Sequence, residues 1–236
     1  MTAFTLKIIA LVSMVIDHLA IAFPAYFPIV FRAVGRLAWP IFAFLVAEGF
    51  RHTKSQEKFL MRLFVFALIS EIPYDLVMGN EINFFANTNI FYTLFLGGFA
   101  IYLFEKLKTR YTLQTMAVIG AIFPSVVLAE FLTVDFGGMG VLFVFAMYVI
   151  QPKKIRLVAI GGFALSQFIP LVMAYSLGFE IKPTYLLMIP FALVTVPLVA
   201  CYNGKRGFNA KWTKWLFYIA YPAHLVLLEV VALLIL

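Results

Sequence analysis

An aspartate and a histidine adjoin each other within an apolar segment near the start of the chain, LKIIALVSMVIDHLA. Because an ionisable side chain in a membrane-spanning helix costs roughly 2.5–3.5 kcal/mol, Asp17 and His18 are candidate functional residues. The ordinary pKa of histidine, about 6.5, lets a neutral ring accept and return a proton near neutral pH. The pair therefore predicts a catalytic site, with a buried histidine that bridges helices as the alternative.

Lys7 lies eleven positions before His18 in the same segment. In a helix this step returns to almost the same face and covers roughly 16 Å along the axis. Such an arrangement suits an anionic donor held at the inner membrane surface while a base acts deeper in the membrane. The alternative for Lys7 is an ordinary anchor whose ammonium group reaches the interface.

Further polar side chains interrupt other apolar segments, and we expect them to line a pocket for an acceptor molecule. Glu71 and Asp75 are four positions apart and share a helix face, with Pro73 between them. Two compatible interpretations are open: a carboxylate forms an ion pair with Arg36 that locks helices together, and the acidic pair attracts the amine of an acceptor. The full set of predicted pocket residues is Arg36, Glu48, Glu71, Tyr74, Asp75 and His224.

A basic connector, RHTKSQEKFLMR, follows the second apolar segment and contains Arg51, Lys54 and Lys58. Such a cluster ordinarily marks the inner membrane surface or contacts anionic lipid. It would also bind a phosphorylated donor from the cytoplasm, because guanidinium and ammonium groups pair with phosphate oxygens.

Several common enzyme classes lack their signature motifs in this sequence. The motifs GxxxxGK[ST], HExxH, GxSxG and CxxCH are all missing, which gives no support to an ATPase, a zinc protease, a serine hydrolase or a c-type cytochrome. One cysteine, Cys201, cannot build a cysteine metal cluster. We therefore expect no metal cofactor.

The composition is that of a membrane protein. Of 236 residues, 64% are hydrophobic and 12% are charged, whereas a soluble domain has about 45–50% apolar and about 25% charged residues. This excludes a soluble enzyme and a nucleic-acid-binding domain. We expect an all-α, polytopic integral membrane protein with one domain over residues 1–236.

Apolar runs of the length needed to cross a bilayer cover nearly the whole chain. They predict about nine transmembrane helices, with eight to ten as the range. The expected ranges are 7–23, 36–50, 59–79, 89–105, 113–132, 138–150, 155–178, 184–202 and 213–235.

Most of the 18 Lys and Arg residues lie in every second connector between these ranges. The third, fifth and seventh connectors contain one basic residue, Lys182. The first connector holds Arg32 and Arg36. The positive-inside bias places the N-terminus in the cytoplasm and, with an odd helix count, the C-terminus outside.

Several motifs, taken together and in this order, resemble those of a known family. They are LKIIALVSMVIDHLA, VGRLAWPIFAFLVAEGFRHTKS, ALISEIPYDLV, NIFYTLFLG and FYIAYPAHL. Together they resemble the TraX family, named for the conjugation protein that acetylates the N-terminus of F-type pilin. The family is distantly similar to integral-membrane acyltransferases that modify O-antigen sugars and heparan sulfate glucosamine, using a membrane histidine and a cytoplasmic acyl-CoA.

Those acyltransferases carry a basic residue, ten intervening positions and a histidine in their first helix. Lys7 and His18 match this spacing, with Lys where Arg is commoner. The resemblance implies that His18 is the catalytic base or a transient acetyl carrier. It also implies that Arg51, Lys54 and nearby cations lie near the phosphates of acetyl-CoA.

We thus expect an acetyltransferase of the bacterial inner membrane that uses acetyl-CoA. The acceptor would be the amine of a pilin or peptide N-terminus, or an amine or hydroxyl of a surface glycan. One alternative is a proton-coupled transporter or flippase in which Asp17, His18 and Glu71 relay protons. Another is a non-catalytic membrane partner in pilus or surface-fibre assembly.

Overall fold

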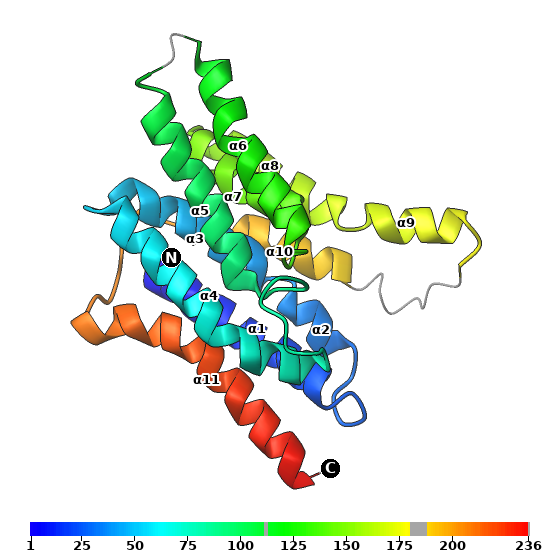
Figure 1. Cartoon of the computed structure of the whole chain (residues 1–236). Helices are drawn as coiled ribbons and strands as arrows, with labels where there is room; N and C mark the ends of the chain where they lie inside the picture. The colour runs from blue at the N-terminus through cyan, green and yellow to red at the C-terminus, as the bar shows by residue number, and fades with distance from the viewer. Residues whose placement is uncertain (111–112, 180–187, 236) are drawn as a thin grey trace. The chain divides into compact units, whose positions relative to one another are not determined.

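The computed structural model describes residues 1–110, 113–179 and 188–235, and within them all regular secondary structure is α-helical (Figure 1). The helices are α1 (Ala3–Ala22), α2 (Val30–Gly35), α3 (Ala38–His52), α4 (Gln56–Met78), α5 (Ile90–Leu107), α6 (Gln114–Phe131), α7 (Gly137–Val149), α8 (Lys153–Ser166), α9 (Ile169–Ser176), α10 (Met188–Ala200) and α11 (Lys211–Ile235).

The predicted class, an all-α polytopic membrane protein, is confirmed. Six described segments are long and apolar enough to cross a membrane: Ala3–Ala22, Val30–His52, Ile90–Leu107, Gln114–Phe131, Lys153–Ser176 and Trp212–Ile235. Gly137–Val149 and Pro190–Ala200 are shorter apolar helices. The count of nine spans stays a prediction, and Lys182 with the start of the range 184–202 lies outside the described residues.

The chain forms two compact units, Met1–Phe42 with Pro152–Leu236, and Ala43–Gln151. A single domain over residues 1–236 stays a prediction.

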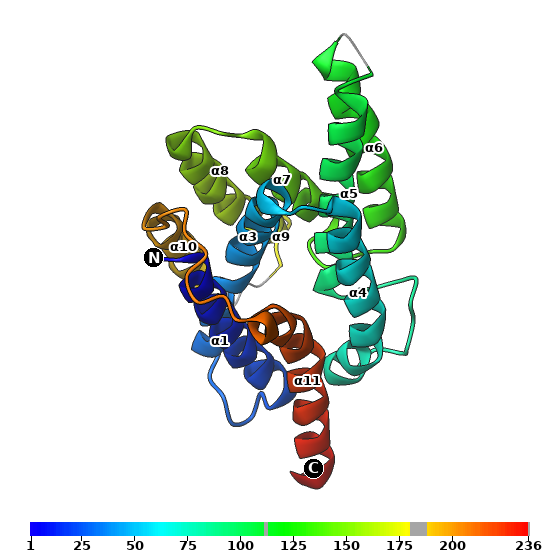
Figure 2. The same cartoon turned by 90° about the vertical axis from the view of Figure 1, so that its left-hand side faces the viewer.

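In the first unit, α1 packs against α2 and α11, and α10 packs against α2 and α8. Figure 2 shows α11 beside α1. The Thr2 side chain begins α1 by accepting a hydrogen bond from the backbone N–H of Thr5 at 3.2 Å. The first residues also bond to the connector before α11, because Ala3 N–H donates to Lys205 O at 2.9 Å and Phe4 N–H to Arg206 O at 3.0 Å. The start of α1 and this basic connector therefore lie at the same end of the unit.

Gly35 allows α2 to approach α1 closely. A Cβ atom at this position would lie 2.3 Å from Cβ and 2.4 Å from Cγ of Asp17. Such distances are far inside van der Waals contact, so no side chain fits there without displacing a helix. The glycine thereby determines how near α2 lies to the Asp17–His18 segment.

In the second unit, α5 contacts α4, α6 and α7. Two adjacent glycines of α5 permit close approach of neighbouring helices. A Cβ on Gly97 would lie 2.5 Å from Cβ of Val144 in α7, and a Cβ on Gly98 would lie 2.7 Å from the ring of Phe50 in α3. Small residues at such contacts are typical of helix packing in membranes.

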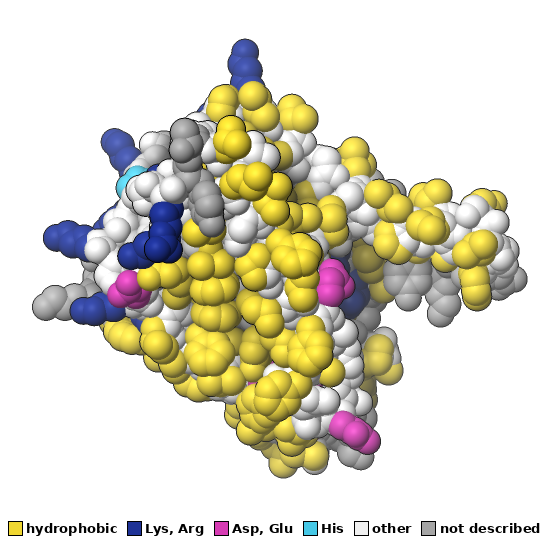
Figure 3. All heavy atoms as spheres, turned by 45° about the horizontal axis from the view of Figure 1, so that its top comes forward, with side chains coloured by type: hydrophobic (Ala, Val, Ile, Leu, Met, Phe, Trp, Pro, Cys, Tyr) yellow, Lys and Arg dark blue, Asp and Glu magenta, His cyan; other side chains and the backbone are white. Residues whose placement is uncertain are grey.

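The surface of this unit includes a stripe of exposed apolar side chains along α6, which are Met116, Ile119, Phe123, Val127 and Phe131. Their spacing of three or four residues puts them on one helix face. Apolar side chains dominate the molecular surface shown in Figure 3. An unpartnered apolar face of this kind is suited to contact with lipid tails.

Candidate functional site

The site in the first unit is built on α1, which buries both Asp17 and His18 to 8% exposure. The eleven-residue spacing puts Lys7 and His18 on the side of α1 that meets α11. Lys7 Nζ lies 5.0 Å from the ring centre of Phe217, and His18 contacts His224. Phe217 and His224 are seven positions apart on α11, which is two helical turns.

His18 and His224 form a direct contact between α1 and α11. Nδ1 of His18 lies 2.6 Å from Nε2 of His224. The two rings lie edge to edge in nearly the same plane, with centroids 4.9 Å apart and planes within 3° of parallel. Nε2 of His18 has no hydrogen-bond partner among the residues that the structure describes. One ring nitrogen of His18 is thus engaged by the protein and the other is left for a further group.

Asp17 pairs with two arginines of the α2 region and not with the adjacent histidine. Its Oδ1 lies 3.4 Å from Nη1 of Arg32, and its Oδ2 accepts a hydrogen bond from Nη2 of Arg36 at 3.2 Å. Nε of Arg36 also donates to the Arg32 carbonyl at 3.3 Å. The cluster links α1 to α2 and gives Arg36 its carboxylate partner.

In the second unit, Glu71 is fully buried and holds the start of α5. Its Oε2 accepts hydrogen bonds from the backbone N–H of Asn89, at 3.1 Å, and from the Asn89 side-chain amide. The same amide donates to Ala67 O at 2.8 Å. Oδ1 of Asn89 accepts from the N–H of Phe91 at 2.9 Å, which caps α5.

Asp75 is also fully buried, and its Oδ2 accepts a hydrogen bond from the N–H of Asn83 at 2.9 Å. The second oxygen of each carboxylate, Oε1 of Glu71 and Oδ1 of Asp75, is buried and has no hydrogen-bond partner among the described residues. Tyr74, between them in sequence, is half-buried. The two acids therefore anchor the segment between α4 and α5 while retaining unused acceptor oxygens.

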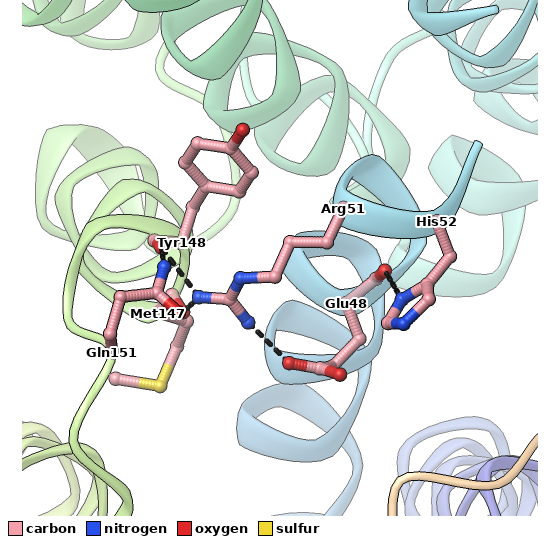
Figure 4. A network of polar contacts seen from close by, with 6 residues as sticks. All are labelled: Glu48, Arg51, His52, Met147, Tyr148 and Gln151. Atoms are coloured by element: carbon pink, nitrogen blue, oxygen red, sulfur yellow. Dashed lines mark hydrogen bonds and ion pairs between the residues drawn. The ribbon is translucent and has the colours of Figure 1, made fainter. Parts of the chain in front are cut away.

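Arg51 is engaged in a polar network at the end of α7, drawn in Figure 4. Its guanidinium donates to Glu48, to Met147 O at 2.6 Å and to Tyr148 O. His52 Nδ1 lies 2.8 Å from Glu48 O. Because the last carbonyls of a helix have no partner within the helix, Arg51 satisfies two groups that α7 leaves open.

The other predicted cations of this connector, Lys54 and Lys58, are exposed. Their ammonium groups form no ion pair among the described residues. The Ser55 side chain between them accepts from the N–H of Lys58 at 3.3 Å and begins α4. Of the basic residues expected near a donor's phosphates, these two present their charges to solvent, whereas Arg51 is committed to contacts within the unit.

Sequence reasoning missed two partners that the structure reveals. Arg32 binds Asp17 together with Arg36, and its place four positions before Arg36 could have indicated a shared helix face. Asn89 binds Glu71, and its position directly before an apolar run is typical of a helix N-cap. His224 is one of the predicted pocket residues, and the structure shows that it contacts His18 directly.

Comparison with known proteins indicates the family. A family model described as "TraX protein" matches residues 3–232. The chain is 29% identical over 242 residues to the "Probable fimbrial assembly protein FimC, serogroup H1" of Dichelobacter nodosus, and the match covers 96% of this chain and 94% of that protein. No solved structure matches the chain.

Proposed function

Because this chain belongs to the TraX family, we propose that it is a membrane-bound acetyltransferase that moves an acetyl group from acetyl-CoA to an amine or hydroxyl. The observation that supports the proposal is the hydrogen bonding of the two ring nitrogens of His18. This buried ring uses Nδ1 for a contact within the protein and keeps Nε2 for another group. A general base or a nucleophile requires such an available nitrogen.

In direct transfer, the acceptor nitrogen or oxygen attacks the thioester carbonyl of acetyl-CoA while His18 Nε2 takes the proton of the attacking group. The bond from carbon to nitrogen or oxygen forms, the carbon–sulfur bond breaks, and the proton passes from His18 to the CoA thiolate. In the two-step route, Nε2 itself attacks the thioester, the carbon–sulfur bond breaks and CoA leaves as the thiolate. The acceptor then attacks the acetyl group, the bond from Nε2 to the acetyl carbon breaks, and the proton of the acceptor passes through the freed Nε2 to the thiolate. Both routes use the same lone pair.

Positively charged side chains support the proposed binding of acetyl-CoA. Lys7 is half-buried on the same side of α1 as His18, and Lys54 and Lys58 are exposed cations that can attract the phosphates of CoA. We assign Arg51 a smaller part in donor binding than the sequence predicts, because its guanidinium already binds Glu48 and two carbonyl groups.

The acceptor we propose is the free N-terminal amine of a pilin or another exported peptide, with an amine or hydroxyl of a surface glycan as the second choice. The relative from Dichelobacter nodosus is named as a fimbrial assembly protein, which supports the peptide class. The location we propose is the bacterial inner membrane, with the N-terminus in the cytoplasm, where acetyl-CoA is made, and the C-terminus outside.

A second candidate function is a proton-coupled transporter. The buried and unpartnered oxygens Oε1 of Glu71 and Oδ1 of Asp75 favour it, because carboxylates of this kind often relay protons in membranes. A non-catalytic role in fibre assembly is the remaining alternative. Both alternatives predict that purified protein does not consume acetyl-CoA.

The experiment uses protein purified into lipid nanodiscs, with acetyl-CoA and either a synthetic peptide with a free N-terminus or glucosamine as acceptor. Formation of free CoA thiol and acetylated acceptor is measured for the wild type, His18→Ala and the matched control His52→Ala. We expect His18→Ala to lose at least about 10²-fold in rate and His52→Ala to stay near the wild type. Equal rates in His18→Ala and the wild type would refute the role of His18.

A further inference from the structure

His224 also contacts the backbone of its own helix, and this contact determines where its proton lies. Nδ1 of His224 is 2.9 Å from the carbonyl oxygen of Ala220. A carbonyl oxygen only accepts hydrogen bonds, so Nδ1 of His224 must carry hydrogen and donate it. In a neutral ring the other nitrogen, Nε2, then holds a lone pair and accepts.

The facing nitrogens of the two rings share one hydrogen. With Nε2 of His224 as the acceptor, the 2.6 Å contact requires Nδ1 of His18 to be the donor. Neither ring contacts a carboxylate among the described residues, since the oxygens of Asp17 face Arg32 and Arg36. An added positive charge on the pair would be unpaired and buried, so two neutral rings fit the geometry.

We propose that His224 is a positioning residue that holds His18 in the tautomer with hydrogen on Nδ1, which leaves the lone pair of Nε2 for the reacting group. This inference rests on the proposed acetyl transfer through His18 and deepens it. The chain of hydrogen bonds runs from His18 Nδ1–H to His224 Nε2, and from His224 Nδ1–H to Ala220 O.

The packing around His224 keeps its ring in the orientation that this role needs. The planes of the His18 and His224 rings are parallel to within 3°. The buried ring of Tyr221 packs edge-on against both, with its centroid 6.1 Å from that of His18 and 5.5 Å from that of His224. His224 is therefore held by its own helix, by α1 and by an aromatic neighbour. Without it, the ring of His18 would be free to carry its hydrogen on Nε2, which is the wrong tautomer for attack or proton removal.

The first test reads the tautomer directly by ¹⁵N NMR of protein labelled at histidine and held in nanodiscs. The chain has three histidines, so His18→Gln, His52→Gln and His224→Gln assign the spectrum. We expect Nε2 of His18 to be unprotonated in the wild type and to become protonated in a substantial fraction of His224→Leu molecules. A protonated Nε2 in the wild type, or an unchanged His18 signal in His224→Leu, would overturn the inference.

The second test measures turnover. His224→Leu removes the acceptor for His18 Nδ1–H, and we expect kcat to fall about 10²-fold with little change in KM for acetyl-CoA. His224→Gln can accept the same hydrogen bond through its amide oxygen and should stay within about tenfold of the wild type. Melting curves of both variants check that they are folded to the same extent.

The two tests separate this inference from the proposed function. If the wild type transfers acetyl and folded His224→Leu is equally fast, the role of His224 is refuted while acetyl transfer stands. If the wild type transfers no acetyl group, the proposed function is refuted, and the NMR spectrum still decides whether His224 fixes the tautomer of His18.

Discussion

The two neighbours Asp17 and His18 have separate tasks in the structure. His18 faces α11 and bonds to His224, whereas Asp17 faces α2 and bonds to Arg32 and Arg36. The consecutive positions point about 100° apart on the helix, which sends the two side chains to different neighbours. Asp17 therefore serves α1–α2 packing, and its predicted catalytic role stays a prediction that mutation can test.

We expect Asp17→Asn to destabilise the protein by about 2–3 kcal/mol, because two guanidinium groups lose their anionic partner within a membrane helix pair. Thermal unfolding in nanodiscs measures this, and Asp17→Asn combined with Arg36→Gln should recover part of the loss. Acetyl transfer per folded molecule should stay within about tenfold of the wild type. A loss of rate as large as that of His18→Ala would instead assign Asp17 to catalysis.

For individual residues, the sequence predicts which are unusual in a membrane helix but not which of them are in contact. The cost of burying ionisable groups identifies Asp17, His18, Glu71 and Asp75, all of which are buried. The partner of His18 lies 206 positions away. That contact depends on the packing of α1 against α11, for which no local pattern in the sequence is diagnostic.

The helices coincide with the predicted apolar segments. Where a helix begins or ends at another residue than predicted, the cause is local. The range 36–50 corresponds to α3, which begins at Ala38, after the separate helix α2. Pro40 lacks the N–H that would bond to the carbonyl of Arg36, so a continuous helix is interrupted just there. Pro170 lies in the first turn of α9 and accompanies a similar break between α8 and α9 within the range 155–178.

The contact between α1 and α2 is testable through Gly35. We expect Gly35→Ala to cost about 1–3 kcal/mol, because the new methyl group would overlap Asp17 and force the helices apart. Acetyl transfer should fall along with stability, since His18 adjoins the displaced residue. Denaturation midpoints and rates measure both effects.

The matched control for Gly35→Ala is Gly162→Ala. Gly162 lies within α8, and a Cβ atom there would meet nothing within 4 Å. Alanine is favoured over glycine in a helix by roughly 1 kcal/mol, so this variant should be neutral or slightly more stable. Equal behaviour of the two variants would contradict the close approach of α2 to α1.

At the scale of the whole chain, composition alone predicts the class, since 64% hydrophobic residues exceed what a soluble core can bury. The alternation of basic connectors agrees with the hydrogen bonds that join the first residues to Lys205 and Arg206, because both segments are assigned to the same side of the membrane. The number of spans was harder to predict, because α7 and α10 are apolar but short.

Positive charge at the membrane surface should assist donor binding. We expect Lys54→Glu with Lys58→Glu to raise KM for acetyl-CoA about tenfold or more, with a smaller effect on kcat and a weaker dependence on salt than the wild type. The matched control reverses two exposed cations at the start of α8, Lys153→Glu with Lys154→Glu. Equal KM increases in both double variants would indicate general surface charge and not a donor site.

Transfer of an acetyl group through His18 can be followed by mass spectrometry after incubation with ¹³C-acetyl-CoA and a free-amine peptide, because this measurement detects the label on either the peptide or His18. We expect labelled peptide from the wild type and none from folded His18→Gln. Acetyl transfer through His18 would be contradicted if folded wild-type protein left the label on CoA at millimolar acetyl-CoA, or if His18→Gln labelled the peptide equally well.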